Sequence, residues 1–403
     1  MVNENLKMSS ERLKSMQNKF AEDFKNEIIP GAVVLVGRFG SIQHFEALGY
    51  RDRENELMME RDSIFCLASI SKLFTSVAAM MLVESGQLQL SEPVSRYLPK
   101  FKNLQVSVER QRFVQGDVVR ALVPAAREMT IHDLLRHTSG LTYGEFGNSF
   151  VQQAYIKERV FDWNQTNAEF VEKLAGLPLA YHPGSTFEYG MSTDVLGHII
   201  ELVSGHSLDE FFQEKLCKPL RLQDTTFHLD DRQLRRLALP SPAKAAESET
   251  PIDLARPQHS KWLSGGGGLF STALDVFRLM QMLLNGGQLD GAEILSRKTV
   301  QLMTCDHLSP NIGYGPYIEA LQMTAPTPEM GQGFGLGFAV RTAQGRNPLP
   351  GSIGDFYWAG VSGTYVWADP VENLVGVLML RAPAERIHYR SMIRQFVYQA
   401  LVV

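Results

Sequence analysis

The segment from Leu73 to Leu82 carries apolar side chains on nearly every side of a helix. Surface helices keep a polar face, so a helix of this kind has to be enclosed by other parts of the chain. The apolar pattern extends over residues 64–86, and we expect one buried helix there. The remaining sequence must therefore fold around it, and 403 residues suffice for two domains or for one domain with a large insertion.

A serine and a lysine stand near the start of this apolar segment. Residues i and i+3 of a helix are surface neighbours, so the Ser69 hydroxyl and the Lys72 amine can meet. Burial disfavours a charged amine, and so does the positive end of the helix dipole. We therefore expect Lys72 to lose its proton readily and to activate Ser69 as a nucleophile. Taken alone, the same pattern also fits a serine that only caps a helix.

A tyrosine lies just before another expected helix. Tyr189 precedes an amphipathic pattern over residues 193–203. A phenol near an amine can relay a proton, which makes Tyr189 a candidate partner of Lys72 in general base catalysis. Taken alone, this local sequence also fits a core tyrosine whose hydroxyl is hydrogen-bonded.

A third segment combines a bulky indole with small residues. Trp358 is followed by Ala359, Gly360 and Val361, and small residues let a ligand approach a strand backbone closely. We predict that the backbone N–H groups of Ser69 and Val361 bind an oxyanion. A glycine-rich turn between strands is the alternative interpretation of this segment taken alone.

Hydrophobic periodicity outlines the rest of the chain. Further helices are expected over residues 8–28, 131–136, 168–175, 193–203, 208–216, 273–284 and 387–401. Strands are expected over residues 32–37, 42–48, 335–342, 363–367 and 374–380, and residues 241–257 are typical of a loop. We predict an α/β domain formed by residues 1–68 and 258–403, and a mostly helical domain formed by residues 69–257. The active site is expected between them, and loops at residues 144–152 and 311–331 are expected to shape its pocket.

Taken together, the three segments resemble one known family. Ser69-x-x-Lys72, Tyr189 and Trp358-Ala359-Gly360 follow the order and spacing found in the serine β-lactamase and penicillin-binding-protein superfamily. The likeness is strongest to its esterase branch, the family VIII carboxylesterases. Residues 131–141, 197–205 and 266–272 are also similar, and the resemblance extends from about residue 10 to the end of the chain.

This resemblance implies a class C β-lactamase-like fold, in which an antiparallel sheet is flanked by helices and a mostly helical domain is inserted. It implies that Ser69 forms an acyl-enzyme, that Lys72 and Tyr189 act as a coupled general base, and that no metal or organic cofactor is required. The expected partner is a small-molecule ester, and the natural ester and the oligomeric state are left open.

Two departures from the β-lactamase pattern favour esters. Met191 stands where a Tyr-x-Asn motif would have asparagine, and Trp358-Ala359-Gly360 replaces Lys-Thr-Gly. The missing lysine and threonine suit the carboxylate of a β-lactam, whereas an indole favours an apolar acyl or alcohol group. The esterase branch typically has Trp-Gly-Gly, from which Ala359 deviates. We therefore predict hydrolysis of short-chain neutral esters. The alternatives are acyl transfer to another acceptor, weak β-lactam hydrolysis, and a non-catalytic binding protein on this fold.

Composition and short motifs argue against several other functions. A net charge of −5 provides no basic surface for nucleic acid. Residues 1–33 contain no apolar signal-peptide core and no long apolar run follows, so we expect a cytoplasmic protein without a membrane span. Three scattered cysteines indicate no disulfide framework, and the common zinc motifs and the Gly-x-Ser-x-Gly elbow are absent. His137 is expected to be structural.

Overall fold

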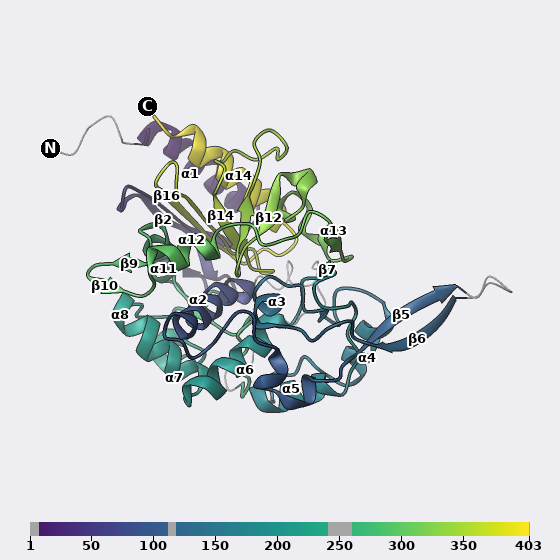
Figure 1. Ribbon diagram of the computed structural model, residues 1–403. Coiled ribbons are helices and arrows are strands. Elements are labelled where there is room, and N and C mark those ends of the chain that lie inside the picture. The colour runs from purple at the N-terminus through teal and green to yellow at the C-terminus, as the bar shows by residue number, and fades with distance from the viewer. Residues whose placement is uncertain (1–7, 112–117, 241–259, 403) are drawn as a thin grey trace.

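The main sheet of the protein is antiparallel, and its strands come from both ends of the chain (Figure 1). The computed structural model describes residues 8–111, 118–240 and 260–402. Within these residues the strand order of the sheet is β12-β13-β14-β15-β16-β1-β2-β3. The strands are β1 (Gly31–Arg38), β2 (Ser41–Asp52), β3 (Leu57–Met58), β12 (Gln332–Phe334), β13 (Ala339–Arg341), β14 (Phe356–Ala359), β15 (Tyr365–Asp369) and β16 (Leu374–Leu380).

The two central strands are buried along their whole length. Every residue of β1 and β16 is buried, which requires cover on both faces of the sheet. Helix α11 (Ala273–Leu284) packs on β1, β15 and β16, whereas α1 (Ser10–Lys25) and α14 (Arg386–Gln399) pack on each other and on β2 and β16 (Figure 1). The predicted antiparallel sheet flanked by helices is confirmed.

Most of the described helices lie in the chain between β3 and β12. Its helices are α2 (Ser71–Glu84), α3 (Ile131–Leu135), α4 (Phe150–Lys157), α5 (Asn167–Ala175), α6 (Ser192–Ser204), α7 (Leu208–Phe212), α8 (Lys218–Leu220), α9 (Asp231–Leu234), α11, α12 (Arg297–Met303) and α13 (Ile318–Leu321). Short strand pairs interrupt them: β4 (Phe65–Cys66) with β8 (Phe270–Ser271), β5 (Gln105–Gln111) with β6 (Val118–Pro124), β7 (Thr186–Phe187) with β11 (Gly313–Tyr314), and β9 (Gln288–Leu289) with β10 (Ala292–Glu293).

The division into two domains stays a prediction, since its boundary at residues 257 and 258 lies outside the described residues, as does the loop expected at 241–257. In the part of the chain that the structure describes, no helix combines the length and apolar character needed to cross a membrane.

The buried helix predicted over residues 64–86 is shorter than expected. Helix α2 begins at Ser71, and the preceding β4 pairs instead with β8. Ala68 has a φ of +47°, a left-handed conformation that a continuous helix does not allow. Inside the helix the prediction holds, because most of its apolar side chains are buried and the remaining ones, Met81 and Val83, are partly buried. Apart from this start, each predicted helix corresponds to an observed one.

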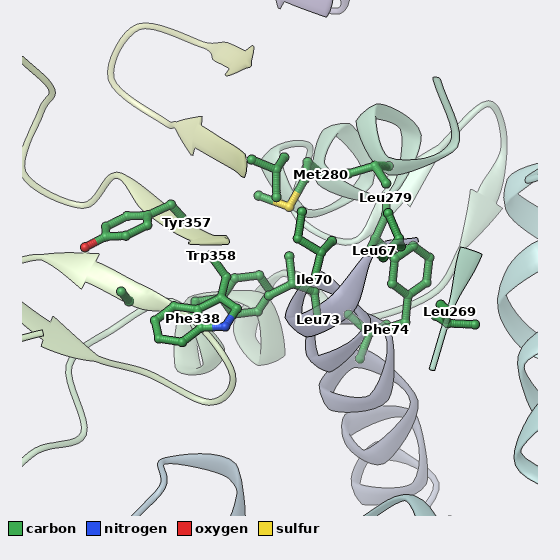
Figure 2. Close-up of a cluster of buried hydrophobic side chains, with 14 of the residues drawn as sticks. Leu67, Ile70, Leu73, Phe74, Leu269, Leu279, Met280, Phe338, Tyr357 and Trp358 are labelled. Carbon is green, nitrogen blue, oxygen red and sulfur yellow. The ribbon is translucent and has the colours of Figure 1, made fainter. Parts of the chain in front are cut away.

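Figure 2 shows where the first turns of α2 pack, against α11 and the end of β14. The labelled side chains in this cluster are Leu67, Ile70, Leu73, Phe74, Leu269, Leu279, Met280, Phe338, Tyr357 and Trp358. The start of α2 is thus held between the sheet and a helix that covers it, which fixes the position of Ser69 and Lys72.

The prediction of a strand over residues 335–342 is wrong for residues 335–338. Only Ala339–Arg341 forms a strand, β13, and the chain turns between β12 and β13. Gly337 makes this turn possible, since its φ is +98° and a Cβ there would lie 2.2 Å from Ser76 Oγ. The β5–β6 ribbon, which projects from the body in Figure 1, was not predicted.

A buried ion network joins α14 to the sheet. Asp355 accepts hydrogen bonds from Arg394 at 2.8 and 3.2 Å and from Arg341 Nε at 2.9 Å. All three side chains are buried. A buried charge is tolerated when it is paired, so each arginine depends on this one carboxylate.

We expect Asp355→Ala to lower the free energy of unfolding by about 3–5 kcal/mol, because it leaves two buried guanidinium groups without their carboxylate. Urea denaturation followed by circular dichroism measures the change. Asp290→Asn is the control: it removes the charge from a partly exposed ion pair with Arg278 and keeps a side chain that tolerates the left-handed backbone there, and its effect should be about 0–1 kcal/mol. Equal effects of the two substitutions would contradict the role given to Asp355.

Candidate active site

Ser69 lies in a sharp turn directly before α2. The turn is a 3-10 helix, Ala68–Ile70, and the left-handed conformation of Ala68 costs roughly 1–2 kcal/mol relative to an ordinary helical one. Such strained positions persist where the surroundings determine them, often next to functional groups. As a result, Ser69 remains partly exposed while Lys72, in the first turn of α2, is 1% exposed.

The amine of Lys72 is surrounded by three oxygen atoms. Its Nζ lies 3.3 Å from Ser69 Oγ, 2.9 Å from Tyr143 Oη and 2.6 Å from the carbonyl oxygen of Gly266. A carbonyl can only accept, so Gly266 takes one N–H of the amine. Burial lowers the pKa of Lys72 to about 8, an effect that the nearby Asp194 carboxylate opposes. Once neutral, the amine has a lone pair available for the proton of Ser69.

Tyr189 is placed next to both groups by β7 and α6. Lys72 Nζ lies 4.7 Å from the centre of the Tyr189 ring, and Trp358 Nε1 donates a hydrogen bond to Tyr189 Oη at 3.1 Å. Burial raises the pKa of Tyr189 above its usual range, and a hydrogen bond with Ser69 opposes this rise. The structure therefore brings Ser69, Lys72, Tyr189 and Trp358 together.

His137 supports the backbone on both sides of Tyr189. Its carbonyl accepts the N–H of Glu188 at 2.9 Å, and its Nδ1 accepts the N–H of Gly190 at 3.4 Å. Burial, followed by the positive charge of Lys72, holds the pKa of His137 well below its usual range. A neutral ring that accepts a backbone hydrogen bond fits a structural residue.

The segment after β14 approaches the turn that carries Ser69. A Cβ on Gly360 would lie 2.5 Å from the carbonyl oxygen of Leu67, so no larger residue fits there. Trp358, Ala359 and Val361 line the same cavity as Ser69. The backbone N–H of Val361 forms no hydrogen bond within the described residues, which leaves it available to a ligand.

The cavity beside Ser69, called here the Ser69 cavity, has a volume of about 940 Å³ including its mouth. Its walls are largely aromatic: Tyr143, Phe146, Phe161, Trp163, Tyr189, Tyr317, Tyr357 and Trp358. The loops expected to shape the pocket contribute Phe146 and Tyr317. Pairing of β11 with β7 brings Tyr317 onto Tyr189, with ring centres 5.0 Å apart and an angle of 23° between the planes.

Sequence reasoning missed Tyr143, Asp194 and Gly266. Asp194 accepts the N–H of Gly266 at 3.0 Å and the hydroxyl of Ser264, which orients the Gly266 carbonyl toward Lys72. A Cβ on Gly266 would lie 2.3 Å from Asp194 Oδ2, so the close approach requires glycine. The glycine run at 265–268 was a visible signal of close packing. Its partners lie about 70 and 190 residues away, and no local pattern reveals them.

We expect Ser69 to react with a fluorophosphonate at a rate that rises with pH and is half-maximal near pH 8, as Lys72 loses its proton. In Asp194→Asn the midpoint should move to lower pH, because the carboxylate that raises the pKa of Lys72 is removed while an acceptor for the Gly266 N–H is kept. Stopped-flow labelling over a pH series measures both midpoints. Glu214→Gln, an exposed substitution, is the control, and a midpoint that moves to higher pH in Asp194→Asn would contradict the assignment.

Comparisons with known proteins agree with this geometry. Residues 16–387 match the family model described as Beta-lactamase. Esterase EstB of Burkholderia gladioli is 29% identical over 391 residues, which cover 91% of this chain and 89% of that protein. Acyltransferase mokF of Monascus pilosus is 32% identical over 310 residues, which cover 73% of this chain and 71% of that one.

Among solved structures, the chain is similar to EstCE1, described as a hydrolase with promiscuous acyltransferase activity. The TM-score is 0.76 at 28% identity, with 96% of this chain and 98% of that chain covered. Since the family model spans most of the sequence and the fold agrees over nearly its whole length, the chain belongs to the Beta-lactamase family.

Proposed function

We propose that this protein is a carboxylesterase that hydrolyses short-chain esters through an acyl-enzyme on Ser69. One observation carries the proposal: the buried amine of Lys72 lies 3.3 Å from the Oγ of Ser69, and Ser69 lines a cavity with many aromatic side chains. An amine whose pKa is lowered to about 8 can take the serine proton near neutral pH. The similarity to Esterase EstB and to the hydrolase EstCE1 supports the same chemistry.

The residues around Ser69 supply a group for each step of ester hydrolysis. Neutral Lys72 removes the Ser69 proton while Oγ forms a bond to the ester carbonyl carbon. The negative charge that develops on the carbonyl oxygen is bound by the backbone N–H groups of Ser69 and Val361. Collapse of this intermediate breaks the bond to the alcohol, which takes a proton from Lys72 through Tyr189. Water then attacks the acyl-enzyme and gives a proton to Lys72 through Tyr189. Lys72 returns a proton to Ser69 Oγ as the acid is released.

The walls of the Ser69 cavity favour an ester over a β-lactam. The position that holds Lys-Thr-Gly in β-lactamases holds Trp358-Ala359-Gly360 here. The Trp358 indole donates to Tyr189 and closes part of the cavity with an apolar surface. Weak β-lactam hydrolysis with the same serine is retained only as an alternative.

Acyl transfer is the second candidate function. Two of the similar proteins carry this activity in their descriptions, one as an acyltransferase and one as a hydrolase with promiscuous acyltransferase activity. The Ser69 cavity opens to the surface, so an alcohol can reach an acyl-enzyme on Ser69 by the same opening as water.

We expect Ser69→Ala to lose its fluorophosphonate adduct and to lower kcat/KM for 4-nitrophenyl butyrate by about 10⁴- to 10⁶-fold, because no nucleophile remains. Intact-protein mass spectrometry and release of 4-nitrophenol measure the two effects. Ser85→Ala, at the far end of α2, should match the wild type. Unchanged turnover in Ser69→Ala, or a folded wild type with neither adduct nor turnover, would reject the proposal in favour of a non-catalytic protein.

Hydrolysis and transfer differ in how the acyl-enzyme is divided between water and an added alcohol. With 4-nitrophenyl butyrate and an alcohol acceptor, we expect butyric acid to remain the main product, since the cavity opens to water. Gas chromatography of acid and new ester at increasing acceptor concentration gives the ratio. A new ester that predominates at millimolar acceptor would instead assign the protein as an acyltransferase.

A further inference from the structure

Helix α14 carries three arginines at intervals of one turn, and their partners differ. Arg394 is paired with Asp355 in the buried network described above. Arg390 is also buried, with 4% of its surface exposed, yet it lines the Ser69 cavity. Its Nη2 donates to the carbonyl of Gly360 at 2.5 Å, and its Nε has no hydrogen-bond partner among the described residues. Most donors of this guanidinium are therefore unused.

Among the described residues, Arg390 has no carboxylate partner. Within the described part of the chain, no carboxylate forms an ion pair with Arg390 or with Arg386, which lines the same cavity one turn earlier. Burial, followed by the charge of Arg386, lowers the pKa of Arg390 to about 10, so it remains a cation at neutral pH. Buried arginines are normally paired, because an isolated buried charge is unfavourable.

The position of Arg390 relates it to the reacting centre. The Gly360 carbonyl that it holds belongs to the residue before Val361, whose N–H is the proposed oxyanion donor. A Cβ on Gly360 would lie 3.4 Å from Ala68 Cβ, in the turn that carries Ser69. A group bound by Arg390 would thus share the Ser69 cavity with the ester carbonyl.

We propose that Arg390, assisted by Arg386, binds a carboxylate carried by the substrate, so that the preferred esters are anionic. This inference rests on the proposed esterase function and specifies its substrate class. Two N–H groups of a guanidinium match the two oxygens of a carboxylate, and such charge-assisted hydrogen bonds are strong in a site shielded from water. In this proposal α14 supplies the cation that residues 358–360 lack, so the proposed substrates differ from the neutral esters expected from the sequence.

The test compares matched substrates that differ only in charge. In one pair the carboxylate is in the acyl group: mono-4-nitrophenyl adipate against its methyl ester. In the other it is in the leaving group: 4-butyryloxybenzoate against 4-butyryloxybenzamide. The ratio of kcat/KM for acid over neutral ester is the readout, because general damage to the enzyme cancels in it. We expect a ratio of about 10 to 100 for the wild type in one pair, which then locates the carboxylate.

Three variants on α14 separate charge from support of the Gly360 backbone. Arg390→Gln should reduce the ratio to about 1, and Arg390→Lys should retain part of it because the charge is kept. His388→Gln, on the exposed side of the same helix, should leave the ratio unchanged. If Arg390→Gln lowers kcat/KM for both members of a pair equally, Arg390 only supports the Gly360 backbone and the inference is overturned.

Binding distinguishes failure of this inference from failure of the proposed function. Isothermal titration calorimetry of the wild type with adipate and with adipamide should show tighter binding of the diacid, which is lost in Arg390→Gln. Ester turnover without preference for anionic substrates in either pair overturns the inference and leaves the esterase intact. Selective adipate binding that depends on Arg390, without turnover of any ester, upholds the anion site and rejects the esterase.

Discussion

The buried amine of Lys72 is the group on which the rest of the site depends. A charged ammonium is unfavourable in the interior, so the fold must surround Lys72 with hydrogen-bond acceptors or let it become neutral. It does both, since the Gly266 carbonyl and Tyr143 contact the amine while burial lowers its pKa. Asp194 limits this lowering and also holds the Gly266 peptide, so the same carboxylate influences the pKa of the amine and the position of its hydrogen-bond acceptor.

Enclosure of Lys72 requires segments from the whole chain. Helix α2 contacts α6. Its first turns also pack against α11 and the end of β14 (Figure 2). The close approaches are made at glycines: Gly266 reaches Asp194, Gly337 reaches Ser76, and Gly360 reaches Leu67. At each of these positions a Cβ would overlap with a neighbouring atom. The absence of a side chain therefore determines how tightly the interior closes around the amine.

The arginines of α14 show that the groups packed around a side chain determine its role. Arg394 meets a carboxylate of the sheet and contributes to stability, whereas Arg390, one turn earlier, meets a carbonyl and an open cavity. Both are buried, and nothing in the repeated spacing of arginines distinguishes them. Their difference arises because their partners lie at opposite ends of β14: Asp355 directly precedes the strand, and Gly360 directly follows it beside the Ser69 cavity.

The sequence by itself determined the features that depend on neighbours along the chain. The apolar periodicity of α2, the Ser69-x-x-Lys72 spacing and the alternation of strands and helices at both ends are local, and they predicted the main elements of the fold. The start of α2 was misplaced, because pairing of β4 with β8 involves residues about 200 positions apart. Tertiary structure alone decided that Tyr143 and Gly266 contact Lys72, and that Arg390 lines the cavity with no carboxylate partner in the described part of the chain. Contacts between distant segments depend on how the helices and the sheet pack. The residues that determine this packing are spread over the whole chain and do not form a local motif.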